Sequence, residues 1–207
     1  MIRIQAQGIG KRFNREWIFR NLTAEFKTGN IYAITGPNGS GKSTLVQALC
    51  GQMPLSQGVL TYYENEVEIP IEQVFEKVSI AAPYLDLIDE FSLHEQVRFH
   101  ATGKSFSVNL TENDIIEQLY LQENRNKFLM NFSSGMKQRV KLALALFSDS
   151  PVIFLDEPGT NLDRKAFTWY LDNLQRIKAH KLIFIASNQP VEYPAEAIPV
   201  NLASYKM

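Results

Sequence analysis

The chain has 207 residues, of which 45% are apolar and 21% are charged, values typical of one globular domain spanning residues 1–207. Its formal net charge of -1 gives no overall electrostatic reason to expect nucleic acid as a partner. The single cysteine, Cys50, excludes an internal disulfide and is typical of a reducing compartment. Residues 1–10 lack the apolar stretch of a signal peptide, and no run approaches the roughly 20 apolar residues that span a bilayer. We therefore expect a cytoplasmic protein.

Three segments near the N-terminus have the composition of short strands. They are IRIQA (2–6), WIFRNLTAEF (17–26) and IYAIT (31–35). The third runs directly into a glycine-rich loop, and the helical periodicity of residues 43–50 after that loop ends at Gly51, a suitable helix C-terminus. Residues 58–70 then predict two strands that turn near Glu64 and Asn65.

The glycine-rich loop matches the whole phosphate-loop pattern GxxxxGK[ST]. Its glycines allow tight turns in which successive N–H groups point at phosphate oxygens, and the following helix adds the positive end of its dipole. Lys42 brings a full charge to the outer phosphates, and Ser43 offers a hydroxyl to Mg²⁺. The residues expected to bind nucleotide here are Gly36, Pro37, Asn38, Gly39, Ser40, Gly41, Lys42, Ser43 and Thr44.

Helix formers become frequent from about residue 84 to residue 149, which predicts a helical insert. The apolar runs that follow, in 151–158 and 181–189, each end in polar residues, as do strands buried on both faces of a parallel sheet. Such sheets bind ligands outside the carboxyl ends of their strands. At that place we expect Asp156 to hold Mg²⁺, through a water, and Glu157 to orient and polarise an attacking water.

A second possible anion site begins in NFSSGMKQRVKLALALF, residues 131–147. Ser133 and Ser134 are good helix N-caps, and Gly135 would let a phosphate approach the backbone. One apolar stripe follows on the helix: Val140, Ala143, Leu144 and Phe147. Taken alone, these facts fit an ordinary capped core helix equally well.

In their order, these segments resemble the ATP-binding cassette (ABC) ATPases over nearly the whole chain. The segment at Ser133 is similar to that family's signature motif, LSGGQ, and DEPGTNLD at 156–163 is similar to its metal strand and D-loop. The resemblance implies an α/β P-loop NTPase core with a mostly parallel sheet, an N-terminal antiparallel β subdomain and a helical insert. It also implies a head-to-tail dimer, with ATP between the phosphate loop of one copy and Ser133 and Gly135 of the other.

The family's adenine-stacking aromatic falls at Phe13 in this sequence, with Trp17 as a second candidate and a core role for Phe13 as the alternative. Asp163, in the D-loop segment, would signal across the dimer interface to the opposite site. These roles are implied by the resemblance only.

Several positions depart from the family pattern. Tyr84 replaces the Q-loop glutamine, or Pro83 does if the alignment shifts by one residue, and Asp86 is the nearest acidic substitute, although a solvated loop carboxylate fits it better. The first glycine and the glutamine of the signature are serine and methionine. Asn188 replaces the switch histidine; its amide can donate to the γ-phosphate but cannot carry a positive charge, and a turn-forming Asn is the alternative.

The leading hypothesis is an ATPase subunit that powers a membrane transporter through ATP-driven dimer closure. Glu157, Lys42 and Asn188 would be its catalytic residues, and its hydrolysis would be slow without a partner. A separate permease would dock near residues 83–95 and hold the subunit on the inner face of the cell membrane. The alternative is a nucleotide-gated binding or regulatory module with weak hydrolysis, against which Glu157 argues. A translation or repair factor is disfavoured, because translation factors of this family usually carry two cassettes in one chain.

Overall fold

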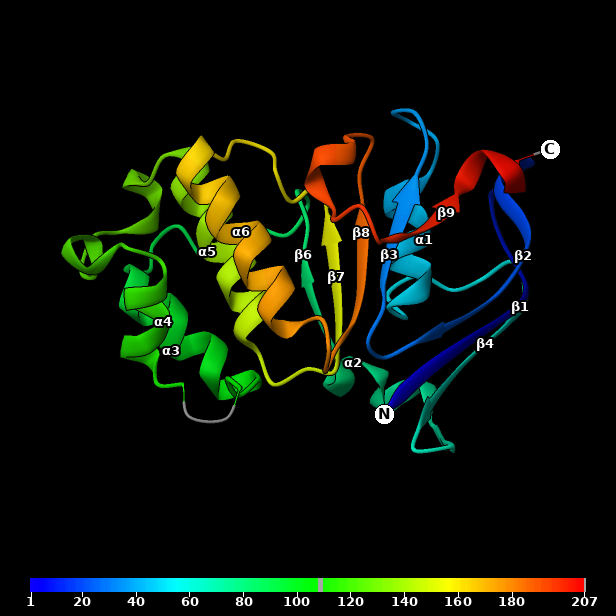
Figure 1. Ribbon diagram of the computed structural model, residues 1–207, viewed down its shortest axis with the longest axis horizontal. Coiled ribbons are helices and arrows are strands. Elements are labelled where there is room, and N and C mark those ends of the chain that lie inside the picture. Colours follow the sequence, from blue (N-terminus) through cyan, green and yellow to red (C-terminus); the bar gives the residue numbers. More distant parts are fainter. Residues whose placement is uncertain (108–109, 207) are drawn as a thin grey trace.

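The computed structural model describes residues 1–107 and 110–206. Residues 108–109, within the predicted helical insert, and residue 207, at the end of the predicted domain, lie outside the described residues. The described strands form two sheets (Figure 1). One is antiparallel, in the order β2-β1-β4-β5, and the other is parallel, in the order β6-β7-β8-β3-β9. The predicted α/β class with its parallel core and N-terminal antiparallel part is therefore confirmed.

The parallel sheet consists of five short strands. Their bounds are β3 (Ile31–Thr35), β6 (Val78–Ala81), β7 (Val152–Asp156), β8 (Leu182–Ala186) and β9 (Ile198–Asn201). Every residue of β7 and β8 is buried, because alternate side chains enter different cores on the two faces. Phe154 and Phe184 stack at 4.7 Å in one core, and Ile153 and Ile183 lie in the other.

Helix α1 (Lys42–Leu49) packs in the core between the parallel sheet and the antiparallel sheet. The antiparallel strands are β1 (Ile2–Phe13), β2 (Glu16–Lys27), β4 (Gln57–Glu64) and β5 (Val67–Ile69). The predicted turn near residues 64–65 is confirmed, and β1 extends seven residues beyond the predicted 2–6. Cys50 is buried in this core, and burial raises the pKa of its thiol to about 11, which fits the predicted core role rather than a nucleophile.

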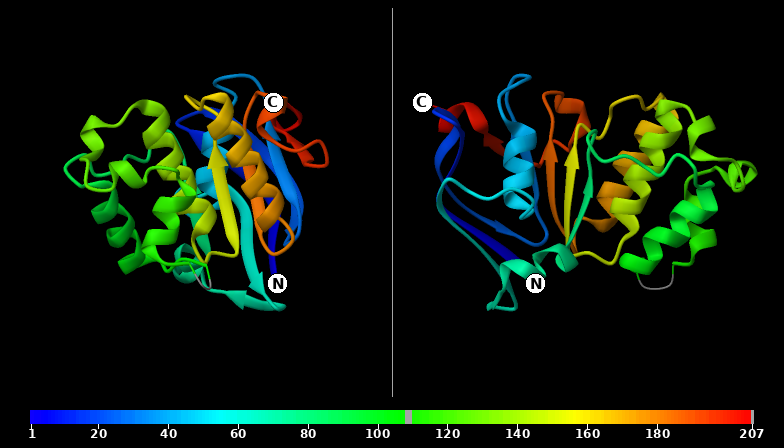
Figure 2. Two further views of the ribbon diagram at one scale, coloured as in Figure 1. Left: turned by 60° about the vertical axis from the view of Figure 1, so that its left-hand side comes forward. Right: turned by 180° about the vertical axis from the view of Figure 1, so that it is seen from behind.

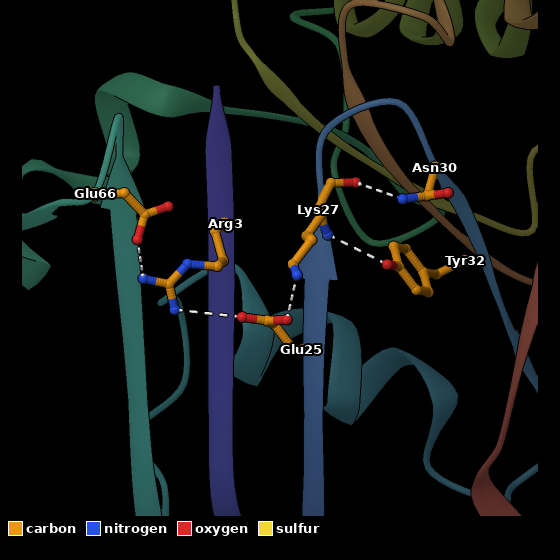
Figure 3. A network of polar contacts seen from close by, with 6 residues as sticks. All are labelled: Arg3, Glu25, Lys27, Asn30, Tyr32 and Glu66. Carbon is orange, nitrogen blue, oxygen red and sulfur yellow. Dashed lines mark hydrogen bonds and ion pairs between the residues drawn. The ribbon is translucent and has the colours of Figure 1, made fainter.

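A polar network on the antiparallel sheet joins strands that are distant in sequence (Figure 3). The Arg3 guanidinium lies 2.7 Å from a carboxylate oxygen of Glu66 and 3.4 Å from one of Glu25. Glu25 also pairs with Lys27 at 2.6 Å, and the Lys27 backbone N–H donates to the Tyr32 hydroxyl. Exposed ion pairs of this kind contribute little free energy, and within this network only the bond from Lys27 to Tyr32 connects β2 with β3.

The second core lies on the other face of the parallel sheet and is covered by helices. These are α3 (Leu93–Gly103), α4 (Glu112–Gln118), α5 (Ser134–Phe147) and α6 (Arg164–Ile177), while the short α2 (Val74–Lys77) precedes β6. Capping boxes at Ser92–Glu95 and Thr111–Asp114 start α3 and α4. The antiparallel sheet and helices α3 and α4 lie at opposite ends of the molecule (Figure 2).

The predicted apolar stripe on α5 is buried, as are the predicted strands β7 and β8. Among the α-helices and strands of the described residues, α2, β6, α6 and β9 were not predicted. None of the helices in the described part of the chain is both long and apolar enough to cross a bilayer.

Candidate functional site

The phosphate loop joins the carboxyl end of β3 to the N-terminus of α1. Gly41 adopts φ 99°, and a Cβ there would overlap the Ile18 side chain of β2, so glycine is required on both counts. Beside the loop lies a recess of about 300 Å³. It is lined by Ile18, Asn38, Gly39, Gly41, Lys42, Ser43, Thr44 and Glu157. Six of the nine predicted loop residues line this recess together with Glu157, the predicted general base, while Gly36, Pro37 and Ser40 do not line it.

Lys42 is folded back over the loop that precedes it. Its ammonium donates to the carbonyls of Gly36 at 3.0 Å and Pro37 at 3.2 Å, and the side chain is 5% exposed. These neutral acceptors satisfy the ammonium without neutralising it, so its charge remains available to an anion in the recess.

Asp156 ends β7 and is 1% exposed. Within the described residues, neither of its carboxylate oxygens has a hydrogen-bond partner of acceptable geometry. Burial raises the pKa of Asp156 and the nearby charge of Glu157 adds to this, while the Ser43 hydroxyl and the Lys42 charge oppose it. A buried carboxylate without a partner is costly, and a bound cation would remove that cost.

A magnesium ion fits these residues better than a metal held by protein alone. Among the described residues no group of three or more His, Cys, Asp or Glu side chains could hold a metal ion. Magnesium is usually held by one or two carboxylates and by substrate phosphates. Asp156 and Ser43 together match that donor set.

Glu157 follows β7 with φ 48°, a left-handed conformation that is uncommon for a residue with a side chain. Its backbone N–H donates to the Ala186 carbonyl at 2.9 Å, which holds the turn against the end of β8. From β8 the chain continues to Asn188, whose amide donates to the Asn38 side chain at 2.9 Å. The predicted switch residue therefore lies against the phosphate loop.

Tyr84 is 41% exposed and forms no hydrogen bond with Asp156 in the described part of the chain. Burial raises the pKa of Tyr84 to about 12, the charge of Asp156 adds to this shift, and a hydrogen bond with Gln47 of α1 opposes it. Asp86 points away into solvent, with a side chain 92% exposed and 3.5 Å from the Lys141 ammonium. Asp86 therefore lies in solvent, as predicted for a solvated loop residue, and Tyr84 stays the candidate for the position of the missing glutamine.

The signature residues lie elsewhere in the chain. Ser133 is exposed and caps α5, its hydroxyl accepting from the Met136 N–H at 3.2 Å. A Cβ on Gly135 would lie 2.6 Å from the carbonyl oxygen of Asn161. Neither Ser133 nor Gly135 lines the recess beside the phosphate loop. A single copy of the chain does not bring its two anion-binding helix ends together.

Phe13 ends β1 with 47% of its surface exposed, and it does not line the recess either. The Lys11 ammonium lies 5.1 Å from its ring centre. Trp17 is the weaker alternative, because the guanidiniums of Arg12 and Arg20 already lie over its ring, at 5.6 and 4.7 Å. Phe13 thus has an exposed ring available for stacking and is not a core residue.

Two site residues escaped sequence reasoning. Ile18 of β2 packs against Gly41 of the phosphate loop. Glu192 is 2% exposed, and burial raises its pKa, with the charges of Glu157 and Asp156 adding to that shift. An isoleucine in a strand carries no chemical signal, and Glu192 lies outside every motif. Only the tertiary fold could reveal either one.

A phosphate loop at the end of β3, with Asp156 at the end of β7 two strands away in the same parallel sheet and Glu157 directly after it, defines a P-loop NTPase-type site. The model of the family described as ABC transporter matches residues 19–160, more than half of this sequence. The chain belongs to the ABC transporter family.

Curated relatives and solved structures agree with that assignment. The chain is 24% identical over 194 residues to the linearmycin resistance ATP-binding protein LnrL of Bacillus subtilis, covering 91% of this chain and 62% of that protein. It is 28% identical over 205 residues to the spermidine/putrescine import ATP-binding protein PotA of Thermotoga maritima, covering 96% and 54%. This chain therefore spans less than two thirds of either relative.

Two solved structures share the fold. An ABC transporter ATP-binding protein from Pyrococcus furiosus superposes with a TM-score of 0.81 at 22% identity, over 99% of this chain and 100% of that one. A dimeric ATP-binding cassette described as a post-hydrolysis state bound to ADP and Pi also gives 0.81, at 19% identity, over 96% and 94%.

Proposed function

We propose that this chain is the ATP-binding and ATP-hydrolysing subunit of a membrane transporter, driven by closure of two cassettes. The observation that carries this proposal is Asp156, a buried carboxylate without a partner among the described residues, beside Ser43 and the complete phosphate loop. That combination favours a metal-bound nucleoside triphosphate over a simple anion.

The roles of the chain's own residues follow from their positions. Loop N–H groups and Lys42 hold the phosphate oxygens, and Asp156 and Ser43 hold Mg²⁺, which neutralises charge on the outer phosphates when bound. Glu157 lines the same recess and accepts a hydrogen bond from the attacking water. Asn188 turns its amide from Asn38 to the γ-phosphate, a contact that carries no positive charge.

Two copies complete each site. Ser133 is exposed at the N-terminus of α5 and outside the recess of its own chain, which supports its use by the phosphate loop of a second, identical copy. Of the solved structures that share the fold, one is described as a dimer bound to ADP and Pi, which is consistent with this arrangement. Gly135 would approach the same γ-phosphate from the facing copy.

A separate permease would dock on the helical side, near residues 83–95. Exposed aromatic and apolar side chains gather there: Phe99 is 53%, Phe128 51% and Met130 56% exposed. The backbone of residues 89–91 bonds to that of residues 129–130, so these side chains share one region. Exposed apolar clusters of this kind mark interaction sites, and docking there would hold the subunit at the inner face of the cell membrane.

The test is the steady-state ATPase rate of the wild type and of Glu157→Gln, with Glu196→Gln, an exposed glutamate, as the matched control. We expect the wild type and the control to hydrolyse Mg²⁺-ATP slowly and the Glu157 variant to lose at least about 10²-fold. Equal rates for wild type and Glu157→Gln would reject hydrolysis by this site.

One observation favours the alternative, a nucleotide-gated module with weak hydrolysis. Tyr84 stands where the family pattern has a glutamine, and Asn188, whose amide donates to the Asn38 side chain at 2.9 Å, stands where it has the switch histidine. In that case Glu157→Gln would not change the rate, while ATP would still bring two copies together.

A further inference from the structure

Glu192 is a buried carboxyl group to which the proposed mechanism gives no part. It lies in the turn η4 (Pro190–Glu192), four residues after Asn188, and is 2% exposed. Its Oε2 atom has no hydrogen-bond partner in the described part of the chain. Burial raises its pKa, and hydrogen bonds with the Ser187 hydroxyl and the Gly159 backbone oppose that shift.

The side chain of Glu192 presses on the loop that follows β7. A Cβ built on Gly159 would lie 2.5 Å from Oε1 of Glu192 and 2.8 Å from the Phe167 ring, so only glycine fits there. The backbone of Glu192 is itself anchored, because the buried Tyr170 hydroxyl donates to its carbonyl at 2.8 Å. The anchored Glu192 side chain therefore packs directly against the backbone of Gly159.

The loop in question, residues 157–161, is called here the bridge segment. Its first and last residues both have left-handed backbones without being glycine, with φ 48° at Glu157 and 63° at Asn161. Each such residue costs on the order of 1 kcal/mol and persists only where its surroundings hold it. The bridge segment is therefore a strained backbone that needs external support.

Helix α5 contacts the bridge segment at two residues, Pro158 and Asn161. The Asn161 carbonyl faces Gly135 so closely that a Cβ would lie 2.6 Å away, and the Gln138 amide donates to the Pro158 carbonyl at 3.0 Å. The bridge segment therefore connects Glu157 with the N-terminus of α5, which would bind the nucleotide held by a second copy. Glu192 contacts the segment between Pro158 and Asn161, at Gly159.

We propose that Glu192 is a positioning residue: by filling the space against Gly159, it holds the bridge segment so that Glu157 points into its own recess and Gly135 keeps its place for the facing copy. The proposal rests on the proposed function. Its structural part, the support of the bridge segment, can be measured without any hydrolysis.

The first measurement is hydrogen exchange in the nucleotide-free protein. Three backbone N–H groups report on the bridge segment, those of Glu157, Thr160 and Leu162, each of which donates to a backbone carbonyl. In Glu192→Ala we expect these amides to exchange at least about tenfold faster, while amides of α1 keep their rates. Glu192→Gln, which keeps the shape and one acceptor, should restore the protection, and Glu196→Ala, at an exposed glutamate, should change nothing.

The second measurement is the kinetics of ATP hydrolysis. Glu192→Ala should lower kcat about tenfold or more with the Kd for ATP within about twofold, since the phosphate loop is untouched. Gly159→Ala adds a methyl group that displaces the Glu192 side chain, so it should likewise lower kcat while leaving the Kd for ATP unchanged. Glu192→Gln should recover most of the hydrolysis rate. If Glu192→Ala does not fold, Glu192→Asp, shorter by one methylene, carries the same expectation with smaller effects.

The outcomes separate this proposal from the proposed function. Unchanged exchange at the bridge segment in Glu192→Ala overturns the positioning role, whatever the ATPase rate. Faster exchange in Glu192→Ala with an unchanged kcat overturns the claim that Glu192 orients Glu157. A kcat and an ATP affinity that fall together overturn the same claim. A wild type that hydrolyses nothing overturns the proposed hydrolysis alone, because the exchange result still decides whether Glu192 supports the segment.

Discussion

Replacing Asp156 by Asn should make the metal-free protein more stable while removing its metal-dependent response to nucleotide. Asp156 is 1% exposed, and its oxygens have no hydrogen bond of acceptable geometry among the described residues, although the Ser43 hydroxyl and the Lys42 charge act to lower its pKa. An unsatisfied buried polar group costs about 1–3 kcal/mol, and a charged one costs more. An amide of the same shape keeps the packing and removes the charge. We therefore expect the free energy of unfolding at pH 7.5 in EDTA to rise by about 1–2 kcal/mol, or about 2–8 °C in Tm.

The pH dependence gives this prediction a second signature. Burial raises the pKa of Asp156 above its ordinary 3.8, so the folded state holds a proton more tightly than the unfolded state does. The destabilisation caused by the charge is fully present above the raised pKa and disappears as the pH falls to 3.8. The stability difference between Asp156→Asn and wild type should therefore shrink steadily on acidification.

Urea unfolding with and without Mg²⁺-ATP measures both halves of the prediction. The wild type should gain stability with increasing Mg²⁺-ATP, and Asp156→Asn should gain only what ATP in EDTA provides. Asp172→Asn, at an exposed position on α6, is the control and should stay within about 0.5 kcal/mol of wild type. A metal-free Asp156→Asn less stable than wild type, or one with the full Mg²⁺-dependent gain, would refute the reasoning.

Three further predictions concern single side chains. Phe13→Ala should raise the Kd for ATP by about 5- to 150-fold, because stacking on a base contributes about 1–3 kcal/mol. Its affinity for inorganic triphosphate should stay unchanged, and equal losses for both ligands in equilibrium binding would exclude adenine stacking. Asn188→Ala removes the amide that bonds Asn38 at 2.9 Å and should lower kcat about tenfold or more at unchanged ATP affinity, and an unaltered kcat would leave Asn188 as a turn residue. Burial lowers the pKa of His100 from 6.5 to about 4, so the unfolded state binds a proton more tightly and folding stability should fall as the pH drops from 6.5 towards 4. His100→Gln should flatten that decline in urea titrations, and an identical dependence of stability on pH would contradict the assigned cause.

The sequence alone predicted the parts of this fold that depend on local chemistry. The phosphate loop, strands β7 and β8, the α5 stripe and the turn near residues 64–65 each follow from glycine placement, burial or turn residues in one short stretch. Strand β9, with Pro199 inside it and only Val200 buried, shows no strand pattern and is set by its pairing with β3. Helix α6, in contrast, starts at the Asp163 cap and has buried residues at helical spacing, Ala166, Trp169, Tyr170, Asn173 and Leu174, so its sequence did contain a helix signal that the prediction missed.

The residues of the candidate site were likewise predictable only in part. Lys42, Ser43, Asp156 and Glu157 were predicted because their motif positions specify chemistry, and the recess brings the phosphate loop and Glu157 together. The contacts of Gly135 with Asn161 and of Gly159 with Glu192 join segments whose sequences give no sign of one another. Such contacts depend on how closely two backbone segments approach in the fold, which composition and periodicity do not show.

The most direct test of the account is the mass of the Glu157→Gln variant in solution with saturating Mg²⁺-ATP. Light scattering after gel filtration should give one species of two 23.6 kDa chains, and Ser133→Arg added to that variant should return it to one chain while ATP still binds. A Glu157→Gln protein that binds ATP and remains at 23.6 kDa would contradict the claim that two copies complete each site.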